Sequence, residues 1–130
     1  MKLTNKQYQM FLKNRLDAKT NKYHNIKIEY NGIKFDSVRE KNRYVTLKEL
    51  EKLGFIKKLE LQKVFELQPK YTNNNGEHIR AITYKADFYY YDNKLNKYVV
   101  EDTKGFRTDV YKLKKKIFEY VYPNLTIKEI

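Results

Sequence analysis

Cysteine is absent from this 130-residue chain, and proline and glycine are scarce, with two and four residues respectively. Without cysteine, the chain has no disulfide scaffold, no thiolate zinc site and no thiol nucleophile. So few prolines and glycines leave little room for a flexible linker, and one main domain is expected at this length. No apolar run approaches the roughly 20 residues that span a bilayer, and the first residues show no signal-peptide pattern. These absences predict a cytoplasmic protein with no membrane-spanning segment.

Acidic residues are also few, because 16 Asp and Glu stand against 28 Lys and Arg, a formal net charge of +12. The excess lies at the two ends, with 8 basic and 2 acidic side chains in 1–34, 7 and 3 in 104–130, and 13 and 11 in between. A polyanion is the natural partner of such a surface, because binding phosphates releases condensed counterions. The same charge also fits an ordinary lysine-rich surface. A membrane partner is not expected, because the lysine clusters lack a long apolar helical face.

Apolar residues recur with helical and strand periods and predict an α/β fold, a mixed sheet with helices packed on it. The predicted elements are helices at 4–19, 38–53 and 108–122, a hairpin at 28–35, strands at 58–61, 64–67, 79–91, 98–104 and 125–130, and polar turns at 71–77 and 92–97. The helix at 38–53 is expected to bury Tyr44, Leu47, Leu50 and Leu53. The helix at 108–122 is expected to bury Val110, Leu113, Ile117, Phe118 and Val121.

The segment 87–104 groups acidic and basic side chains in a predicted hairpin. With the turn centred between Lys94 and Leu95, Asp87 faces Asp102 across the two strands, and the strand period places Lys104 on the same face. Two opposed carboxylates destabilise a hairpin unless a cation lies between them, and Mg²⁺ prefers such oxygen ligands. The arrangement therefore suits metal-assisted phosphodiester hydrolysis. The alternative is a surface salt-bridge cluster, Asp87 with Lys104 and Asp102 with Lys85, that stabilises the hairpin only slightly.

Two further acids and three tyrosines have competing interpretations. Glu40 is a candidate third acid, but Ser37 and Glu40 also fit a capping box that needs no other purpose. Glu101 is expected to point to the opposite sheet face and to pair with a basic residue rather than a metal. The run 89–91, three tyrosines, is compatible either with base stacking or with alternate burial in the sheet.

Several motifs together resemble a family of small phage and prophage proteins, a domain of unknown function placed in the restriction-endonuclease-like, PD-(D/E)XK, superfamily. The motifs are GIKFDSVREKNRY (32–44), LELQKVFELQP (59–69), ADFYYYD (86–92), VVEDTKG (99–105) and KLKKKIF (112–118). Asp87 matches the isolated acid of the superfamily, and 102–104 matches its (D/E)-x-K element. The resemblance covers about residues 22–130 and leaves 1–21 outside as an N-terminal helical arm.

The resemblance implies a restriction-endonuclease-like core and a DNA endonuclease that requires Mg²⁺, or Mn²⁺ in its place, and no organic cofactor. Asp87, Asp102 and the carbonyl of Thr103 would bind the metal, Glu40 would complete its shell, and Lys104 would orient the attacking water. The residues expected to contact DNA phosphates are Arg107, Lys112, Lys115 and Lys116, for which a solvated helix face is the alternative.

Branched or recombining DNA, cut by a Holliday-junction-resolvase-like enzyme in a phage setting, is the expected substrate. A resolvase acts on two strands, so a homodimer is expected. The alternative function is a non-catalytic nucleic-acid- or protein-binding module that keeps the fold and the basic surface.

Overall fold

A computed structural model describes residue 6, residues 27–104 and residues 106–130. The chain divides into two compact units, Met1–Glu49 and Leu50–Ile130. Apart from residue 6, the helix predicted at 4–19 lies outside the described residues, as does the predicted domain boundary after residue 21. Within the described ranges, no helix has the length and apolar character needed to cross a membrane.

The first unit contains the predicted hairpin. Strands β1 (Ile28–Tyr30) and β2 (Ile33–Phe35) pair antiparallel, as the sequence indicates. The turn residues Asn31 and Gly32 have φ angles of 52° and 76°. Positive φ at both central positions is the requirement of a type I′ turn, which Asn-Gly meets with little strain.

Helix α2 (Val38–Lys52) follows this hairpin. It begins where the hydroxyl of Ser37 accepts the backbone N–H of Glu40 at 3.1 Å, so the predicted cap is present. It ends before Gly54, whose φ of 84° suits a helix C-terminus. Leu53 lies beyond the last helical residue and is 64 % exposed, so its predicted burial is wrong. The residues of α2 predicted to be buried, and found so, are Tyr44 and Leu47.

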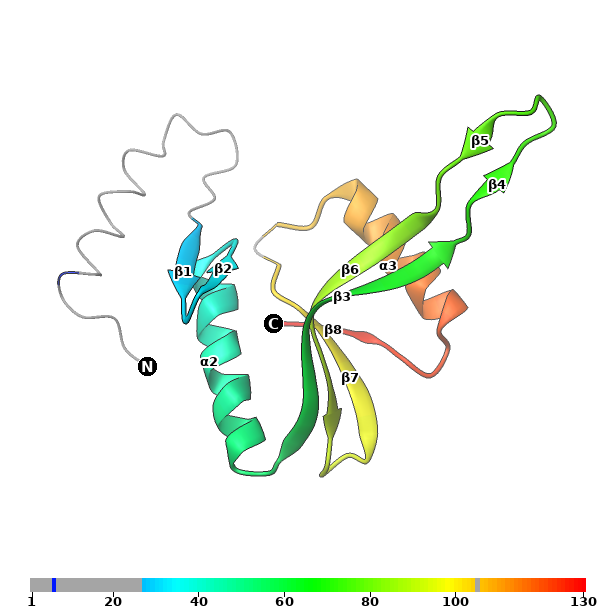
Figure 1. Cartoon of the computed structure of the whole chain (residues 1–130). Helices are drawn as coiled ribbons and strands as arrows, with labels where there is room; N and C mark the ends of the chain where they lie inside the picture. Colours follow the sequence, from blue (N-terminus) through cyan, green and yellow to red (C-terminus); the bar gives the residue numbers. More distant parts are fainter. Residues whose placement is uncertain (1–5, 7–26, 105) are drawn as a thin grey trace. The chain divides into compact units, whose positions relative to one another are not determined.

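The second unit is built on a mixed four-stranded sheet (Figure 1). Its spatial order is β3 (Ile56–Gln68), β6 (Ile82–Asp92), β7 (Lys97–Asp102) and β8 (Ile127–Glu129). The first three strands pair antiparallel, whereas β8 lies parallel to β7. The predicted mixed sheet is therefore present.

Several strand boundaries differ from the prediction: β7 ends at Asp102, so Lys104 lies past the strand, and the last strand spans only Ile127–Glu129. Residues 58–61 and 64–67 belong to one continuous strand, β3. Within this strand, Lys58 and Gln62 have positive φ angles of 57° and 55°. One register shift in the pairing of β3 with β6, between Lys57 and Glu60, accompanies the positive φ of Lys58, and a second lies between Glu66 and Gln68. The strand predicted at 79–91 is instead split by Arg80 and Ala81.

The split leaves a separate two-stranded arm. Strands β4 (Tyr71–Thr72) and β5 (His78–Ile79) pair with each other and extend beyond the ends of β3 and β6 (Figure 1). The side chain of Asn73 accepts the backbone N–H groups of Asn75 and Glu77, both at 3.0 Å, and so orders the tip.

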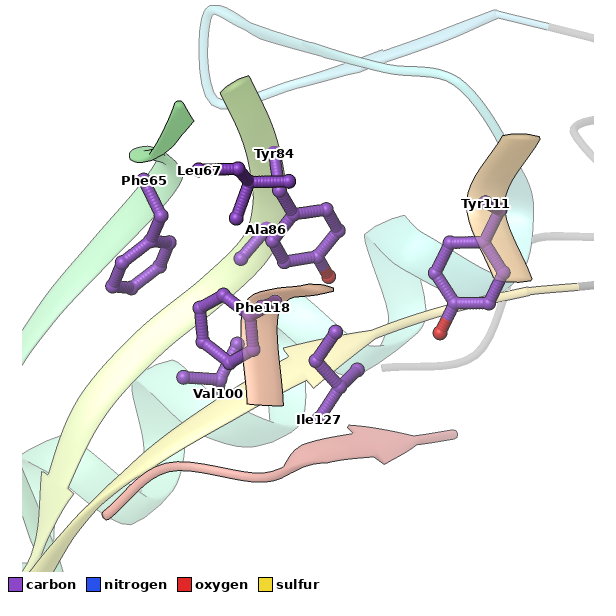
Figure 2. Packing of buried hydrophobic residues seen from close by; sticks show 8 residues of the cluster. All are labelled: Phe65, Leu67, Tyr84, Ala86, Val100, Tyr111, Phe118 and Ile127. Atoms are coloured by element: carbon purple, nitrogen blue, oxygen red, sulfur yellow. The ribbon is translucent and has the colours of Figure 1, made fainter. Parts of the chain in front are cut away.

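Helix α3 (Asp109–Val121) packs on the sheet, and Thr108 caps it by accepting the N–H of Tyr111 at 3.0 Å. The core between them is largely aromatic, and the ring centroids of Phe118 and Phe65 are 5.0 Å apart. Both side chains are seen in Figure 2. The buried residues of this core are Phe65, Leu67, Tyr84, Ala86, Val100, Tyr111, Phe118 and Ile127. The predicted buried face of α3 is only partly correct, because Phe118 is buried but Val110, Leu113 and Val121 are 63 %, 59 % and 41 % exposed.

Candidate active site

The β6–β7 hairpin has the register that the sequence predicts. Tyr91 pairs with Tyr98 and Phe88 with Glu101, so the next positions in the same register are Asp87 and Asp102. The turn between the strands is held by Asp92, whose carboxylate accepts the backbone N–H of Lys94 at 2.8 Å. Because side chains on a strand alternate between faces, this register directs Asp87 and Asp102 to one side of the sheet.

Asp87 is fixed by the residue that follows β7. Its Oδ2 accepts the backbone N–H of Thr103 at 2.8 Å and the Thr103 hydroxyl at 2.7 Å. These two hydrogen bonds anchor a carboxylate on β6 to the end of β7. Thr103, which the family resemblance implicates through its carbonyl, therefore also positions Asp87 through its two donors.

Asp102 is fully buried, and its two oxygens differ in their surroundings. The hydroxyl of Tyr84 donates a hydrogen bond to Oδ2 at 2.6 Å. The ammonium of Lys104 lies 3.3 Å from Oδ1, within ion-pair distance, yet Oδ1 accepts no hydrogen bond of good geometry. A buried carboxylate oxygen without a hydrogen bond is costly, and such atoms are rare in folded proteins.

The environment of Asp102 changes its acidity. Burial raises the pKa of the Asp102 carboxyl to about 6, and the negative charge of Asp87 adds to the rise. The hydrogen bond from Tyr84 and the positive charge of Lys104 act in the opposite direction. Asp87 is opposite Asp102 in the register and is hydrogen-bonded to the next residue, Thr103, so the two carboxylates are near neighbours.

Lys104 lies between this acid pair and the start of α3. Its ammonium is 4.7 Å from the centre of the Tyr111 ring, and its side chain is 32 % exposed. The aromatic face and the buried carboxylate hold a cationic side chain that still reaches solvent. This position gives a charged donor access to both Asp102 and a bound molecule.

Glu129 on β8 pairs with Asp102 in the sheet and binds polar side chains of the segment around α3. Its carboxylate accepts hydrogen bonds from Arg107 at 2.8 Å and from the Tyr111 hydroxyl at 2.9 Å, and Lys115 lies 3.4 Å away. Partial burial works to raise the pKa of Glu129, but the bonds from Tyr111 and Arg107 and the charge of Lys115 outweigh it, so that pKa is lowered. Burial and the bond to Glu129 raise the pKa of Tyr111.

The predicted DNA-contacting residues therefore fall into two pairs. Arg107 and Lys115 both form ion pairs with Glu129, and their side chains are 57 % and 31 % exposed. Lys112 and Lys116 are exposed on α3. Part of the positive charge at this end of the chain thus serves to join α3 to β8.

The two remaining predicted acids, Glu40 and Glu101, are both buried. Glu40 is buried in the first unit, on the first turn of α2, and its role in a metal shell stays a prediction. Glu101 is fully buried and accepts a hydrogen bond from the hydroxyl of Tyr90. This tyrosine partner was not foreseen, because a basic partner was expected.

Tyr84, Tyr111 and Glu129 were not predicted to belong to this region. Tyr84 precedes Asp87 by three residues on the same strand, a spacing that does not predict contact between its side chain and β7. Glu129 comes beside Asp102 only because β8 adds to the sheet in parallel. Strand order of that kind is set by tertiary packing and leaves no local sequence signal.

The donor set fits a divalent cation with few protein ligands. Within the described ranges, no three or more His, Cys, Asp or Glu side chains gather in a group that could hold a metal. Mg²⁺ commonly keeps several waters and binds through one or two carboxylates, which is what Asp87 and Asp102 provide. The Oδ1 atom of Asp102 is the oxygen that lacks a hydrogen bond and would accept a cation.

A protein-family model matches residues 20–130 of the chain. The chain belongs to the family described as Protein of unknown function (DUF1064). The match covers the whole second unit and residues 20–49 of the first, so Asp87, Asp102 and Lys104 all lie within the DUF1064 region. No curated protein and no solved structure matches the chain.

Proposed function

We propose that this DUF1064 protein is a Mg²⁺-dependent DNA endonuclease with a restriction-endonuclease-like site. The observation that supports the proposal is the meeting of Asp87 and Asp102 from neighbouring strands, with Lys104 3.3 Å from the buried Oδ1 of Asp102. Two carboxylates and an amine at one point are the groups that metal-assisted phosphodiester hydrolysis requires. The order of strands and helix around them agrees with the superfamily that the sequence resembles.

In this proposal, Asp87 and Asp102 hold the cation, and Mn²⁺ can replace Mg²⁺. A bound ion of this kind supplies a Lewis acid for a phosphate oxygen and lowers the pKa of a coordinated water. Lys104 orients the attacking water and meets the negative charge that develops on the phosphate. Tyr84 and Thr103 are positioning residues, since each donates hydrogen bonds that fix one carboxylate.

The substrate and assembly follow from the same hypothesis. Lys112 and Lys116 are exposed on α3 and would contact backbone phosphates. We propose branched or recombining DNA as the substrate, in the manner of a phage junction resolvase acting as a homodimer.

A cleavage assay tests the proposal. Duplex, single-stranded and four-way-junction DNA are incubated with the full chain over a range of Mg²⁺ concentrations, and products are resolved on a denaturing gel. Asp87→Asn, Asp102→Asn and Lys104→Ala should each abolish cleavage. Asp92→Asn is the matched control, because Asp92 is on the same strand and asparagine can still accept from the N–H groups of Lys94 and Leu95.

The outcomes separate the two candidate functions. Metal-dependent cleavage that Asp87→Asn removes and Asp92→Asn retains supports the nuclease. Salt-sensitive DNA binding without cleavage under any divalent metal indicates a binding module instead. Equal cleavage by the wild type and Asp87→Asn would exclude the acid pair from the reaction.

A further inference from the structure

Three tyrosines form a compact cluster on β6 and β7, next to the candidate site. The rings of Tyr89 and Tyr98 are stacked, with centroids 5.0 Å apart and an angle of 11° between their planes. Tyr91 meets Tyr98 edge to face, at 5.1 Å and 77°. Tyr89, Tyr91 and Tyr98 are called the tyrosine cluster below.

The tyrosine cluster is directed to the same side of the sheet as the acid pair. Asp87, Tyr89 and Tyr91 are two residues apart along β6, and Tyr98 is opposite Tyr91 in the register. Alternate residues of a strand share a face and advance by about 6.8 Å, so Tyr91 lies roughly 14 Å along β6 from Asp87. A linear polymer that lies along β6 and β7 and starts at the acid pair would reach the tyrosine cluster.

Lysine ammonium groups lie over two of the rings. The Lys57 ammonium is 4.9 Å from the centre of the Tyr91 ring, and the Lys63 ammonium is 5.8 Å from that of Tyr89. Lys63 is partly neutralised by Glu60, 3.7 Å away, whereas Lys57 is exposed. Cations interleaved with aromatic rings suit a ligand that has both planar apolar groups and negative charges.

The three tyrosines are less buried than the residues on the other face of β6. Phe88 and Tyr90, on the other face of β6, are fully or almost fully buried. Tyr98 retains 37 % of its surface exposed, and Tyr91 is only half-buried. Tyr89 has one edge against Phe65 of the core, at 5.4 Å, so the cluster is fixed in place while its outer side stays accessible.

We infer that the tyrosine cluster with Lys57 and Lys63 binds a single-stranded segment of nucleic acid beside the acid pair. Bases stack on aromatic rings whatever their sequence, and lysines meet the phosphates between them. The net charge of +12 favours the same partner. The placement beside a cleavage site rests on the proposed nuclease function, whereas the binding itself does not depend on it.

Fluorescence anisotropy with a labelled oligothymidylate tests the inference on the full chain, in EDTA so that no cleavage occurs. Tyr98→Leu should raise the Kd about tenfold, a loss within the range measured for single base–aromatic stacks. Tyr98→Phe keeps the ring and should bind like the wild type. The matched control is Tyr120→Leu, because Tyr120 is 87 % exposed and belongs to α3 rather than to the strands that carry the cluster.

The lysines should have a different signature from the tyrosines. Lys57→Ala and Lys63→Ala should each reduce the slope of log K against log salt by about 0.7, the value for one phosphate contact on a single strand. Tyr98→Leu should weaken binding and leave that slope unchanged. Lys70→Ala, which removes an exposed lysine before β4, is the charge control. Equal Kd values for the wild type, Tyr98→Leu and the lysine variants would overturn the inference.

A measurement on the unmodified chain covers the case in which Tyr98→Leu fails to fold. A thymidylate oligomer containing 5-iodouracil is photo-crosslinked to the protein, and the adducts are mapped by mass spectrometry. Crosslinks in the peptides that contain the tyrosine cluster support the inference, and crosslinks confined to other peptides overturn it.

The same assays separate the inference from the proposed nuclease. If Asp87→Asn does not cleave DNA but still binds oligothymidylate, the result supports the tyrosine cluster as a binding surface that is independent of cleavage. If Tyr98→Leu still cleaves DNA and its Kd for oligothymidylate is unchanged, the proposed nuclease stands and the proposed binding by the tyrosine cluster is overturned.

Discussion

The hydroxyl of Tyr84 donates a 2.6 Å hydrogen bond to one oxygen of Asp102, while the ammonium of Lys104 lies 3.3 Å from the other. Two neighbours on different elements thus define the orientation of one buried carboxylate. Oδ1 is the atom left without a hydrogen bond, and its ion-pair partner Lys104 is 32 % exposed.

Tyr84→Phe should weaken metal binding without removing a ligand. Loss of a hydrogen bond to a carboxylate ligand typically reduces metal affinity about ten- to hundredfold. The free energy of unfolding should also fall by about 2 kcal/mol, as expected for a hydrogen bond to a charged group. Calorimetric titration with Mg²⁺ and urea unfolding measure the two effects. Unchanged metal affinity in a folded variant would show that Tyr84 has only a structural role.

Asp102→Asn should stabilise the metal-free protein. Because burial raises the pKa of Asp102 to about 6, the ionised form is disfavoured in the folded state. At pH 8 the neutral amide should increase the free energy of unfolding by about 3 kcal/mol, from roughly 1.4 kcal/mol for each unit by which the pKa is raised, a rise that already includes the pairing with Lys104. Urea unfolding in EDTA measures this. A variant less stable than the wild type at pH 8 would mean that the ion pair with Lys104 outweighs burial.

Glu129 should make stability depend on pH in the opposite sense. Because the folded-state pKa of Glu129 lies below its usual value, its contribution is present above about pH 4.3 and is lost as the pH falls through the lowered pKa. Glu129→Gln should therefore cost about 1 kcal/mol at pH 7, through its bonds to Arg107 and Lys115, and nothing near pH 2. Thermal unfolding at the two pH values checks this. An equal loss at both would point to packing rather than charge.

The basic residues near α3 should differ in their effects on DNA binding. Lys112→Ala combined with Lys116→Ala should reduce the salt slope of duplex binding by about 2, since each phosphate contact contributes roughly 0.9. Arg107→Ala should instead lower the melting temperature, because Arg107 is hydrogen-bonded to Glu129. Binding isotherms at several salt concentrations and thermal unfolding provide the comparison. A larger slope change for Arg107→Ala than for the double variant would reverse this assignment.

The hairpins were predictable because their signals are local. Asn31-Gly32 forms the first turn, and the polar run 92–97 contains the second. Counting residues outward from the centre of the second turn predicts the pairing of Tyr91 with Tyr98. The candidate acid pair was placed by the same count. Its distances and burial depend on the surrounding structure and were not accessible from the sequence.

The parts that could not be predicted depend on tertiary contacts. The apolar stripe of α3 suggested that Val110 and Leu113 face the core, yet the helix buries Tyr111 instead. The hydroxyl of Tyr111 bonds to Glu129 at 2.9 Å, and its ring lies under Lys104. This hydrogen bond to Glu129 on β8, the strand after the helix, could not be inferred from the spacing of apolar residues in α3.

Metal titration is the most direct test of the shared cation at Asp87 and Asp102. Isothermal titration calorimetry with Mg²⁺, and with Mn²⁺ as a second ion, is carried out on the wild type, Asp87→Asn, Asp102→Asn and the control Asp92→Asn. The wild type and Asp92→Asn should bind the ion, and each of the other two variants should lose binding. Binding of equal strength in Asp87→Asn, or none in the wild type, would contradict a cation held between the two carboxylates.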